Sequence, residues 1–317
     1  MPTNRFAFFN GAIVPIENAK ISIMNHTFNY GTGAFGGLRG YWNDEKDELY
    51  VFRIADHYER VLASAKMLMI DLPYSNEDLV NITLNLLQQE GYREDCYLRP
   101  LVYKSDAVIA VKLNDLQGDF CLFAIPFGRY VDAEEGARVS FSSWRRISDN
   151  SIPARGKFTG AYINSAFIKT EALLNGYDEA LVIDDSGHVS EGSAENVFIV
   201  RNNVLITPPV NSDILEGITR RTVIHLIKEE LGLEVVERPI DRTEFYVAEE
   251  AFFCGTGVQI ASIVEVDRRP VANGKMGPIV RELRDLYFDV VRGKHPSYME
   301  WVTPVYASQP TPITAAD

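Results

Sequence analysis

Hydrophobic residues recur at helical spacing in two stretches of the first third of the chain. Val61 and Leu68 share the apolar face of a helix expected over residues 55–69. A second amphipathic helix is expected over residues 76–90, where Gly91 ends it. Apolar runs predict short strands around these helices, at residues 6–13 (a hairpin with a turn at Asn10-Gly11), 49–53, 97–104 and 120–126.

The rest of the chain alternates between strand and helix patterns. Strands are expected at residues 138–144, 180–184, 197–201, 204–207, 234–239, 251–254 and 263–266, and helices at 162–175, 219–231 and 278–291. Prolines beyond Pro296 predict an irregular tail. This order of elements favours an α+β fold. The polar, acidic stretch 128–136 is expected to link a domain of residues 1–127 to one of residues 137–317.

The composition is that of a globular protein. The chain has 317 residues, of which 46% are hydrophobic and 24% charged, enough for about two domains. A net charge of −13 disfavours general binding to nucleic acid or to anionic membranes. We see no leader-like N-terminus and no apolar run long enough to span a bilayer.

The three cysteines, Cys96, Cys121 and Cys254, are widely spaced and form no CxxC motif. Neither a zinc site nor a disulfide framework is therefore expected. The five histidines show no metal-binding spacing, so we expect no bound metal. Buried free thiols in a reducing compartment are the natural interpretation, which favours a cytoplasmic protein.

One lysine stands in a glycine-containing stretch. Residues 150–162 read Asn-Ser-Ile-Pro-Ala-Arg-Gly-Lys-Phe-Thr-Gly-Ala-Tyr, with Lys157 between Gly156 and Gly160. Such glycines suit a backbone that approaches a ligand closely. A lysine amine forms an imine with an aldehyde cofactor and later moves a proton as the released amine. Taken alone, a solvated surface lysine is the commoner interpretation.

Glu191, in Ser190-Glu191-Gly192, is a candidate partner for a cofactor nitrogen. Pyridoxal 5'-phosphate (PLP) uses a pyridinium ring as an electron sink, and a carboxylate beside the ring nitrogen keeps that nitrogen protonated. The alternative is a solvated loop glutamate that follows a turn at Gly187.

Two turns that contain glycine and threonine are candidate phosphate sites. Residues 215–219 run into the helix expected from Thr219, and the free N–H groups and dipole of a helix start attract anions. Residues 255–257, Gly-Thr-Gly, follow a predicted strand. The alternatives are a helix cap at Thr219 and ordinary turn chemistry. Arg60, on the first predicted helix, is a candidate cation for the same phosphate.

Gly31, Gly33 and Gly36 spell GxGxxG, but the context does not fit a dinucleotide site. Such a site needs a buried strand before the motif and a helix after it, whereas polar residues precede this one and Gly37 and Gly40 follow. A twisted strand with close backbone contacts is expected instead.

Taken together, these stretches resemble the branched-chain amino acid aminotransferases of PLP fold-type IV. D-amino acid aminotransferases, (R)-amine transaminases and aminodeoxychorismate lyases share that class. The matching segments are Tyr30-Gly31-Thr32-Gly33, Phe35-Gly36-Gly37-Leu38-Arg39, Tyr97-Leu98-Arg99-Pro100, Ser142-Ser143-Trp144, the Lys157 stretch, Ser190-Glu191-Gly192, Glu195-Asn196 and Gly217-Ile218-Thr219-Arg220. The resemblance implies a D-amino acid aminotransferase-like fold: a small α+β N-terminal domain and a larger pseudo-barrel C-terminal domain.

The resemblance also implies a role for each of these residues. Lys157 would be the Schiff-base lysine and the proton-transfer base, Glu191 would pair with the pyridine nitrogen, and Tyr162 would donate to the cofactor's phenolic oxygen. The implied phosphate-binding residues are Arg60, Ile218, Thr219 and Thr256. The implied substrate-binding residues are Tyr30, Phe35, Gly37, Arg39, Tyr97, Arg99, Tyr130, Thr256 and Gly257, with Tyr30 contributed by the neighbouring subunit.

The implied activity is PLP-dependent transamination in amino-acid biosynthesis. The enzyme would move the amino group of branched-chain L-amino acids (Leu, Ile, Val) to 2-oxoglutarate by a ping-pong mechanism, as a homodimer or higher homo-oligomer. The Tyr97-x-Arg99 pair favours the branched-chain members. The alternatives are an (R)-amine or D-amino acid transaminase of the same fold type, and a PLP lyase.

Two departures from the family pattern bear on the substrate. Gly36 stands where the branched-chain enzymes usually carry Glu, and residues 107–111, Ala-Val-Ile-Ala-Val, replace part of a glycine-rich loop. An apolar loop at a pocket mouth would admit amines that carry no carboxylate. We therefore expect a specificity that is broader than, or different from, the family norm.

Overall fold

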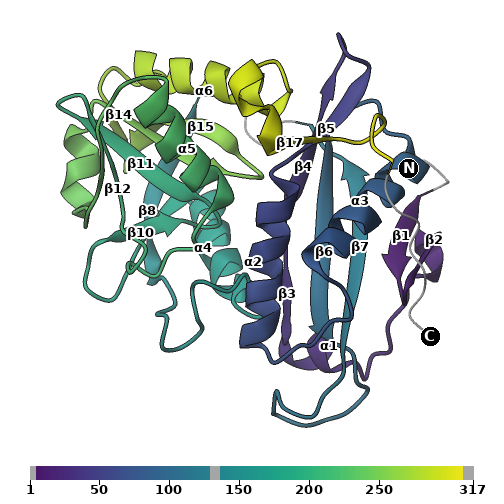
Figure 1. Ribbon diagram of the computed structural model, residues 1–317. Coiled ribbons are helices and arrows are strands. Elements are labelled where there is room, and N and C mark those ends of the chain that lie inside the picture. Colours follow the sequence, from purple (N-terminus) through teal and green to yellow (C-terminus); the bar gives the residue numbers. More distant parts are fainter. Residues whose placement is uncertain (1–4, 129–135, 310–317) are drawn as a thin grey trace. The chain divides into compact units, whose positions relative to one another are not determined.

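The computed structural model describes residues 5–128 and 136–309, which fold into two compact units (Figure 1). The first unit comprises Met1–Gly128, Gly156–Gly160 and Asp289–Asp317, and the second comprises Arg129–Arg155 and Ala161–Phe288. The domain boundaries expected from the sequence stay a prediction. In the structure, the short segment around Lys157 and the C-terminal segment pack with the N-terminal unit.

The first unit is built on an antiparallel sheet. In the part of the chain that the structure describes, it has eight strands in the order β17-β5-β4-β6-β7-β1-β2, with β3 beside β6. The strands are β1 (Phe6–Phe9), β2 (Ala12–Pro15), β3 (Gly33–Phe35), β4 (Leu38–Asn43), β5 (Glu48–Phe52), β6 (Cys96–Lys104), β7 (Gly118–Pro126) and β17 (Val302–Pro304). The helical turn α1 (His26–Tyr30) precedes β3.

Helices α2 (Ile54–Met67) and α3 (Asn76–Glu90) pack on each other and on this sheet (Figure 1). They confirm the two helices predicted from the apolar spacing. α3 begins with a capping box between Ser75 and Asp78 and ends at Gly91, whose φ of 67° favours glycine. The fully buried Tyr58 of α2 hydrogen-bonds Thr83 of α3, which ties the two helices together inside the core.

The second unit is built on a mixed sheet. Its nine strands among the described residues follow the order β10-β9-β8-β15-β14-β11-β12-β13, with β16 beside β15, and β8 runs parallel to both β9 and β15. The strands are β8 (Ala137–Arg145), β9 (Glu179–Ile183), β10 (Val189–Gly192), β11 (Asn196–Arg201), β12 (Val204–Thr207), β13 (Val235–Glu237), β14 (Glu250–Gly255), β15 (Gln259–Val266) and β16 (Arg269–Pro270).

Helices α4 (Tyr162–Leu174) and α5 (Ile218–Glu229) pack on the second sheet, α4 against β8 and β9 and α5 against β13 and β14. The remaining helices are α6 (Pro278–Val291) and the short 3-10 helices η1 (Ile16–Asn18), η2 (Arg242–Val247) and η3 (Pro296–Trp301). Within the described residues, no helix combines the length and the apolar character needed to cross a membrane.

Two expectations for local structure were wrong. The tail beyond Pro296 is not wholly irregular, because Val302–Pro304 forms β17 at the edge of the first sheet, where a proline removes no ladder hydrogen bond. The stretch after Phe28 is a helical turn and two strands rather than one twisted strand. The alternative interpretation of Glu191 as a solvated loop residue is excluded, because Glu191 lies on β10 and is buried.

Glu48 anchors the C-terminal segment to the first sheet. Its side chain is 6% exposed. One carboxylate oxygen accepts the backbone N–H groups of Leu49, Val305 and Tyr306 at 2.9, 3.0 and 2.8 Å, and the other accepts that of Ala307 at 2.8 Å. Hydrogen bonds to a buried charge are strong ones, so this carboxylate holds the chain beyond β17 in place.

We expect Glu48→Ala to lower the free energy of unfolding by about 3 kcal/mol, because it leaves buried N–H groups without an acceptor. Urea unfolding monitored by circular dichroism measures the change. Glu45→Gln is the matched control, since Glu45 is exposed and pairs with Lys294 at the surface. Equal midpoints for wild type and Glu48→Ala would contradict the anchoring role.

Candidate active site

Lys157 lies in a short extended segment that is hydrogen-bonded to β3. The Lys157 carbonyl accepts the Phe35 N–H at 2.9 Å, and the Thr159 N–H donates to the Gly33 carbonyl at 2.8 Å. This antiparallel pairing fixes the backbone of the lysine on the first sheet. The predicted catalytic lysine is therefore held by strand-like hydrogen bonds and not by a free loop.

Glycines make this pairing sterically feasible. Gly31 has a φ of 66°, and a Cβ atom built on it would lie 2.8 Å from the Cα atom of Gly160. A Cβ atom on Gly156 would overlap the ring of Phe158. Gly31 and Gly160 thus permit a close approach of two backbone segments, and Gly156 leaves room for the Phe158 ring.

Ser64 joins the Lys157 segment to helix α2. The Ser64 hydroxyl donates to the carbonyl of Arg60 at 2.8 Å and accepts the backbone N–H of Lys157 at 3.4 Å. Arg60, predicted to bind the cofactor's phosphate, lies one helical turn before Ser64 on α2 and is half-buried.

The strand register places four predicted substrate residues on one face of the first sheet. Arg39 of β4 is paired with Tyr97 of β6, and Phe35 of β3 is paired with Leu101 of β6. Side chains of directly opposed residues, and of alternate residues along a strand, point to the same face. Arg99 lies between Tyr97 and Leu101, two residues from each, so it shares this face with Phe35, Arg39 and Tyr97.

Phe35 brings the amine and a guanidinium together. The Lys157 Nζ atom lies 5.2 Å from the centroid of the Phe35 ring, and the guanidinium carbon of Arg99 lies 4.4 Å from it. Arg99 also donates to the Tyr97 hydroxyl at 3.1 Å. A Cβ atom on Gly37 would overlap that hydroxyl, so glycine is needed there.

Arg39 is a buried cation whose partners are neutral groups. Its side chain is 2% exposed, and its guanidinium donates to the Gly128 carbonyl at 2.5 Å and lies 4.9 Å from the Phe127 ring centroid. No carboxylate of the described residues pairs with it, and its Nε atom has no hydrogen-bond partner among them. A buried charge is costly unless it is paired, so Arg39 is suited to bind an anionic ligand.

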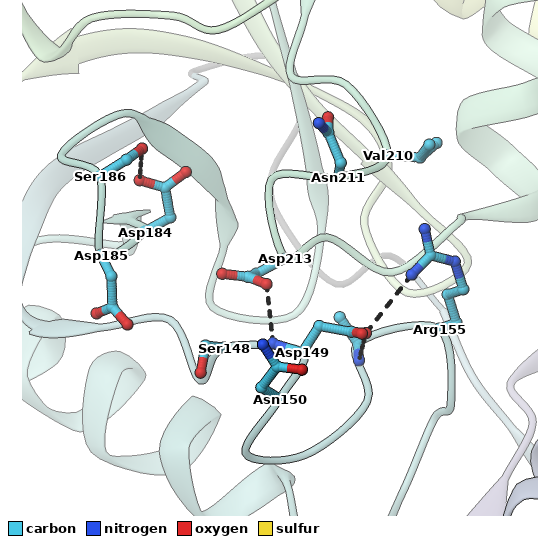
Figure 2. Close-up of a pocket in the computed structure, with 11 residues that line it drawn as sticks. Ser148, Asp149, Asn150, Arg155, Asp184, Asp185, Ser186, Val210, Asn211 and Asp213 are labelled. Carbon is cyan, nitrogen blue, oxygen red and sulfur yellow. Dashed lines mark hydrogen bonds and ion pairs between the residues drawn. The ribbon is translucent and has the colours of Figure 1, made fainter.

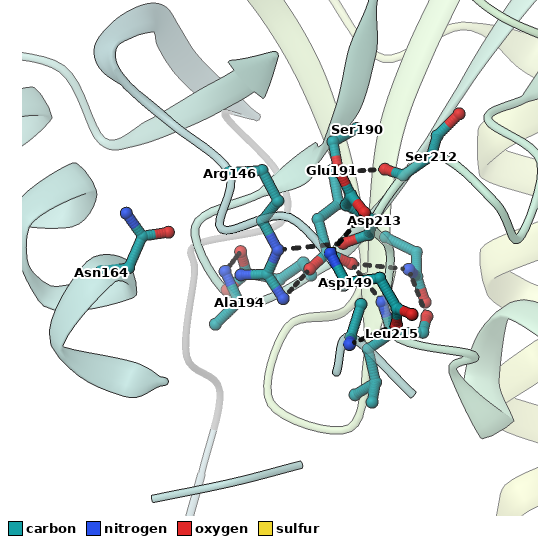
Figure 3. Close-up of polar contacts among 12 residues, drawn as sticks. Arg146, Asp149, Asn164, Ser190, Glu191, Ala194, Ser212, Asp213 and Leu215 are labelled. Atoms are coloured by element: carbon teal, nitrogen blue, oxygen red, sulfur yellow. Dashed lines mark hydrogen bonds and ion pairs between the residues drawn. The ribbon is translucent and has the colours of Figure 1, made fainter. Parts of the chain in front are cut away.

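Glu191 is the centre of a polar network in the second unit (Figure 3). The whole residue is 3% exposed. Oε1 pairs with the Arg146 guanidinium at 2.8 Å. Oε2 accepts the Asn196 amide at 3.0 Å and the Leu215 N–H at 3.2 Å. This carboxylate is therefore fixed in place and supplied with a counter-charge.

The start of α5 is suited to bind an anion. Its N-cap residue is Gly217, which offers no side-chain cap, and the buried Ile218 and Thr219 are the first residues of the helix. The structure thus rules out the alternative of a helix cap at Thr219, and the N–H groups of the first turn are not capped by a side chain of the N-cap residue. A Cβ atom on Gly217 would overlap Oδ1 of Asn196, so this start also depends on a glycine.

The other predicted residues lie at element ends. Thr256 and Gly257 form the turn between β14 and β15, and Tyr162 is the first residue of α4. Tyr30 ends α1, with its ring 4.8 Å from that of His26. Tyr130 lies outside the described residues.

An acidic pocket of about 430 Å³ in the second unit contains none of the predicted residues (Figure 2). Four aspartates line it: Asp149, Asp184, Asp185 and Asp213. Of the described residues in the lining, Arg155 is the one cation, and the four carboxylates outnumber it, so the lining repels a phosphate or a carboxylate. Within the described part of the chain, no three His, Cys, Asp or Glu side chains are arranged to hold a metal ion. The pocket is therefore not where an anionic cofactor would bind.

The sequence did not point to Arg146, and it gave Asn196 no role. Asn196 belongs to a matching segment, and Arg146 lies two residues beyond another. Only the structure shows that both contact Glu191. One signal could have indicated such a partner. A carboxylate that is expected to be buried beside a ring nitrogen needs a cation or hydrogen-bond donors for its own charge.

Comparisons with known proteins identify the family. Residues 38–266 match the family described as amino-transferase class IV. The chain belongs to the class IV aminotransferases. It is similar to a probable branched-chain-amino-acid aminotransferase of Aquifex aeolicus (strain VF5), at 51% identity over 301 residues that cover 95% of this chain and 97% of the relative.

Two solved structures are similar to this chain over 95% of its length. One is a branched-chain aminotransferase from Thermoproteus uzoniensis with norvaline, at 43% identity and a TM-score of 0.91, covering 95% of this chain and 99% of that one. The other is a T.th. branched-chain amino acid aminotransferase complexed with N-(5'-phosphopyridoxyl)-L-glutamate, at 36% identity and a TM-score of 0.90, with coverage of 95% and 99%. The predicted α+β, fold-type IV class is confirmed.

Glu195 is a second buried carboxylate near Glu191. It is 7% exposed, and its Oε2 atom accepts the Ala194 N–H at 3.1 Å. Burial, reinforced by the negative charges of Glu179 and Glu191, raises the pKa of Glu195 to about 8. The folded protein therefore holds a proton on this carboxyl at pH values where the unfolded chain has lost it.

A raised pKa makes stability fall as pH rises. The contribution of Glu195 is fully present below the ordinary carboxyl pKa of about 4.3 and is lost as pH rises through about 8. We expect Glu195→Gln, which stays neutral, to gain melting temperature relative to wild type between pH 5 and pH 8.5. Thermal unfolding of the two cofactor-free proteins across this range measures the gain, with the exposed Glu229→Gln as control. A difference independent of pH would contradict the prediction.

Proposed function

We propose that this class IV aminotransferase uses PLP to move the amino group of leucine, isoleucine and valine to 2-oxoglutarate by a ping-pong mechanism. The relatives named above are called branched-chain aminotransferases, and the similarity covers nearly the whole length of each. The observation that carries the proposal is the Phe35 ring, which Lys157 and Arg99 approach together. A reactive amine and a carboxylate-binding group are what the substrate needs.

The chain's residues fit the cofactor. When bound, PLP supplies an aldehyde that condenses with amines and a ring that accepts electrons. Glu191, buried and fixed, would hold the ring nitrogen, and the N–H groups at the start of α5 would hold the phosphate. Arg60 and Thr256 would add phosphate contacts, and Tyr162 would donate to the phenolic oxygen.

Lys157 performs the proton transfers in this proposal. Its Nζ atom accepts the proton that leaves the α-carbon of the amino donor and later donates it again. The strand-like pairing with β3 restricts the backbone of Lys157, so the amine samples few positions. Restricting a catalytic group in this way lowers the entropic part of the barrier.

The sheet face that carries Phe35, Arg39, Tyr97 and Arg99 must accept an apolar substrate side chain in one half-reaction and an acidic one in the other. Phe35 offers an aromatic ring to the first, and Arg39 and Arg99 offer guanidinium groups to the second. Gly37 would keep the Tyr97 hydroxyl in reach, and Tyr30, Tyr130, Thr256 and Gly257 complete the proposed set. One relative was solved with norvaline and another with a glutamate adduct, which supports both demands.

We propose a homodimer or higher homo-oligomer. Large apolar side chains are exposed on α1, on the residues just before it and on the loop after β6. His26 of α1 is hydrogen-bonded to the Ala110 carbonyl of that loop. More lie exposed on α4, where Phe167 stacks on Trp144. Exposed apolar patches of this kind mark protein interfaces. The exposed residues are Ile21, Ile23, Met24, Phe28, Ile109 and Val111 in the first unit, and Trp144, Ile163, Phe167, Leu173 and Leu174 in the second.

We also propose a cytoplasmic location and a role in amino-acid biosynthesis. Three cysteines that stay unpaired support a reducing compartment. The net charge of −13 supports small-molecule substrates, with neither nucleic acid nor a membrane as partner.

Lys157→Ala should abolish covalent attachment of PLP and lower kcat by more than about 10²-fold, because the protein then has no amine at this position to bind the aldehyde or to move the proton. Mass spectrometry after borohydride reduction measures attachment, and a leucine–2-oxoglutarate assay measures kcat. Lys66→Ala, an exposed lysine of α2, is the control. Covalent PLP in Lys157→Ala would refute the role. If the wild-type enzyme accepts D-leucine or (R)-1-phenylethylamine as amino donor but not L-leucine, the alternative transaminases are favoured.

Arg39→Gln should separate the two substrates. We expect kcat/KM to fall by about 30-fold for L-glutamate and by less than about threefold for L-leucine, because the lost hydrogen bonds to a charged group involve only the acidic side chain. Steady-state kinetics with each donor measures the ratio, and the exposed Arg93→Gln serves as control. Equal losses for both donors would show that Arg39 does not select the acidic side chain.

A further inference from the structure

Arg146 stands at the junction of three segments in the second unit (Figure 3). It follows β8 directly in the chain. Its Nη2 atom pairs with Oε1 of Glu191 on β10 at 2.8 Å, and its Nε atom donates to the carbonyl of Asp213 at 3.1 Å. The Asp213 side chain in turn accepts the N–H of Asp149 at 2.9 Å. The Arg146 guanidinium thus binds both the Glu191 carboxylate and the loop that leads to α5.

The two oxygens of Glu191 are held by different kinds of donor. Oε2 receives the neutral donors of Asn196 and Leu215, whereas Oε1 receives the charged guanidinium of Arg146. The Arg146 side chain is 14% exposed and that of Glu191 is 4% exposed, so solvent screens this pair little. Glu195, which its raised pKa keeps largely protonated at neutral pH, adds little further charge there.

We propose that Arg146 is the positioning residue for Glu191: it fixes the orientation of the carboxylate and keeps it ionised, so that the carboxylate can hold a proton on the cofactor's ring nitrogen. This inference rests on the proposed function. A carboxylate that is buried without a cation would itself take up a proton and lose its hold on the ring nitrogen. Asn196 fixes orientation as well but supplies no charge.

A purely structural role is the competing explanation, because Arg146 also holds the Asp213 loop. The two explanations differ in what they predict for Glu191. A positioning residue acts through the glutamate, so removing it from a protein that already lacks the carboxylate should cost little more. A loop brace acts independently, so its loss should add to the loss of the carboxylate.

The test uses four single variants and one double variant: Arg146→Lys, Arg146→Met, Glu191→Gln, the matched control Arg145→Gln, and Arg146→Met combined with Glu191→Gln. Arg145 is the neighbouring exposed arginine, and it donates to the Asp184 carbonyl rather than to Glu191. Each protein is measured for PLP dissociation constant, for the pH at which the visible band of the PLP-loaded protein titrates, for kcat and KM with L-leucine, and for the melting temperature of the cofactor-free form.

We expect Arg146→Met to lower kcat by about 100-fold, with KM changed by less than about threefold, and to weaken PLP binding by about tenfold. The midpoint of the visible band should move upward by about one pH unit, because a ring with less positive charge holds the neighbouring lysine nitrogen's proton more firmly. Arg146→Lys keeps the positive charge but lacks the several N–H donors of a guanidinium, so its kcat should be about tenfold higher than that of Arg146→Met. Arg145→Gln should match wild type.

The double variant decides the matter. We expect its kcat and band midpoint to equal those of Glu191→Gln alone. Additive losses, or an Arg146→Met protein that matches Arg145→Gln while Glu191→Gln is impaired, would overturn the inference and leave the proposed function intact. If Arg146→Met fails to fold, the pH midpoint of the visible band is measured for Arg146→Lys instead, provided that its melting temperature is within a few degrees of wild type. A midpoint equal to that of wild type would then overturn the inference. A wild-type protein without a visible band after incubation with PLP would instead refute the proposed function.

Discussion

The pairing of residues 156–160 with β3 is the constraint on which the placement of Lys157 depends. A lysine side chain loses about 2 kcal/mol of rotamer entropy when it is fixed, so a moving backbone would make the position of its amine still less defined. Gly31 and Gly160 let the two segments approach to a distance that a Cβ atom would block. Gly31, the first glycine of the sequence that imitates a nucleotide-binding motif, therefore serves this backbone contact. This contact holds the lysine against a rigid sheet.

Buried charges in the chain fall into two groups that differ in their partners. Glu48 and Glu191 are matched by donors from the chain itself, four backbone N–H groups for the first and a guanidinium, an amide and an N–H for the second. Arg39 is as deeply buried, yet its contacts among the described residues are a carbonyl and a ring face. Because an unmatched buried charge is costly, the difference separates two carboxylates whose charge the fold itself matches from a cation that the described residues leave without a counter-charge, as the proposed anion-binding role of Arg39 requires.

Local patterns predicted helices well and predicted non-local contacts poorly. The helices at residues 76–90 and 278–291 were predicted to the residue, because caps and apolar spacing are written within the helix itself. β17 was missed because an edge strand takes its structure from β5, some 250 residues earlier. The candidate site follows the same division. Motifs located Lys157 and Glu191, but the contact of Arg146 with Glu191 joins positions 45 residues apart, and no spacing rule predicts it.

The packing around Gly36 explains why a glycine stands at this position. A Cβ atom on Gly36 would lie 2.7 Å from Pro100 Cγ and 3.2 Å from Val61 Cγ2, so no side chain fits there without displacing both neighbours. Pro100 alternates with Arg99 along β6, and Val61 belongs to α2, so Gly36 packs on the face of the first sheet opposite to Arg39 and Arg99. A side chain at this position would therefore meet α2 and would leave the charge of the face that carries Arg39 and Arg99 unchanged. The glycine at this departure from the family pattern thus answers a packing constraint, and the altered specificity expected from it stays a prediction.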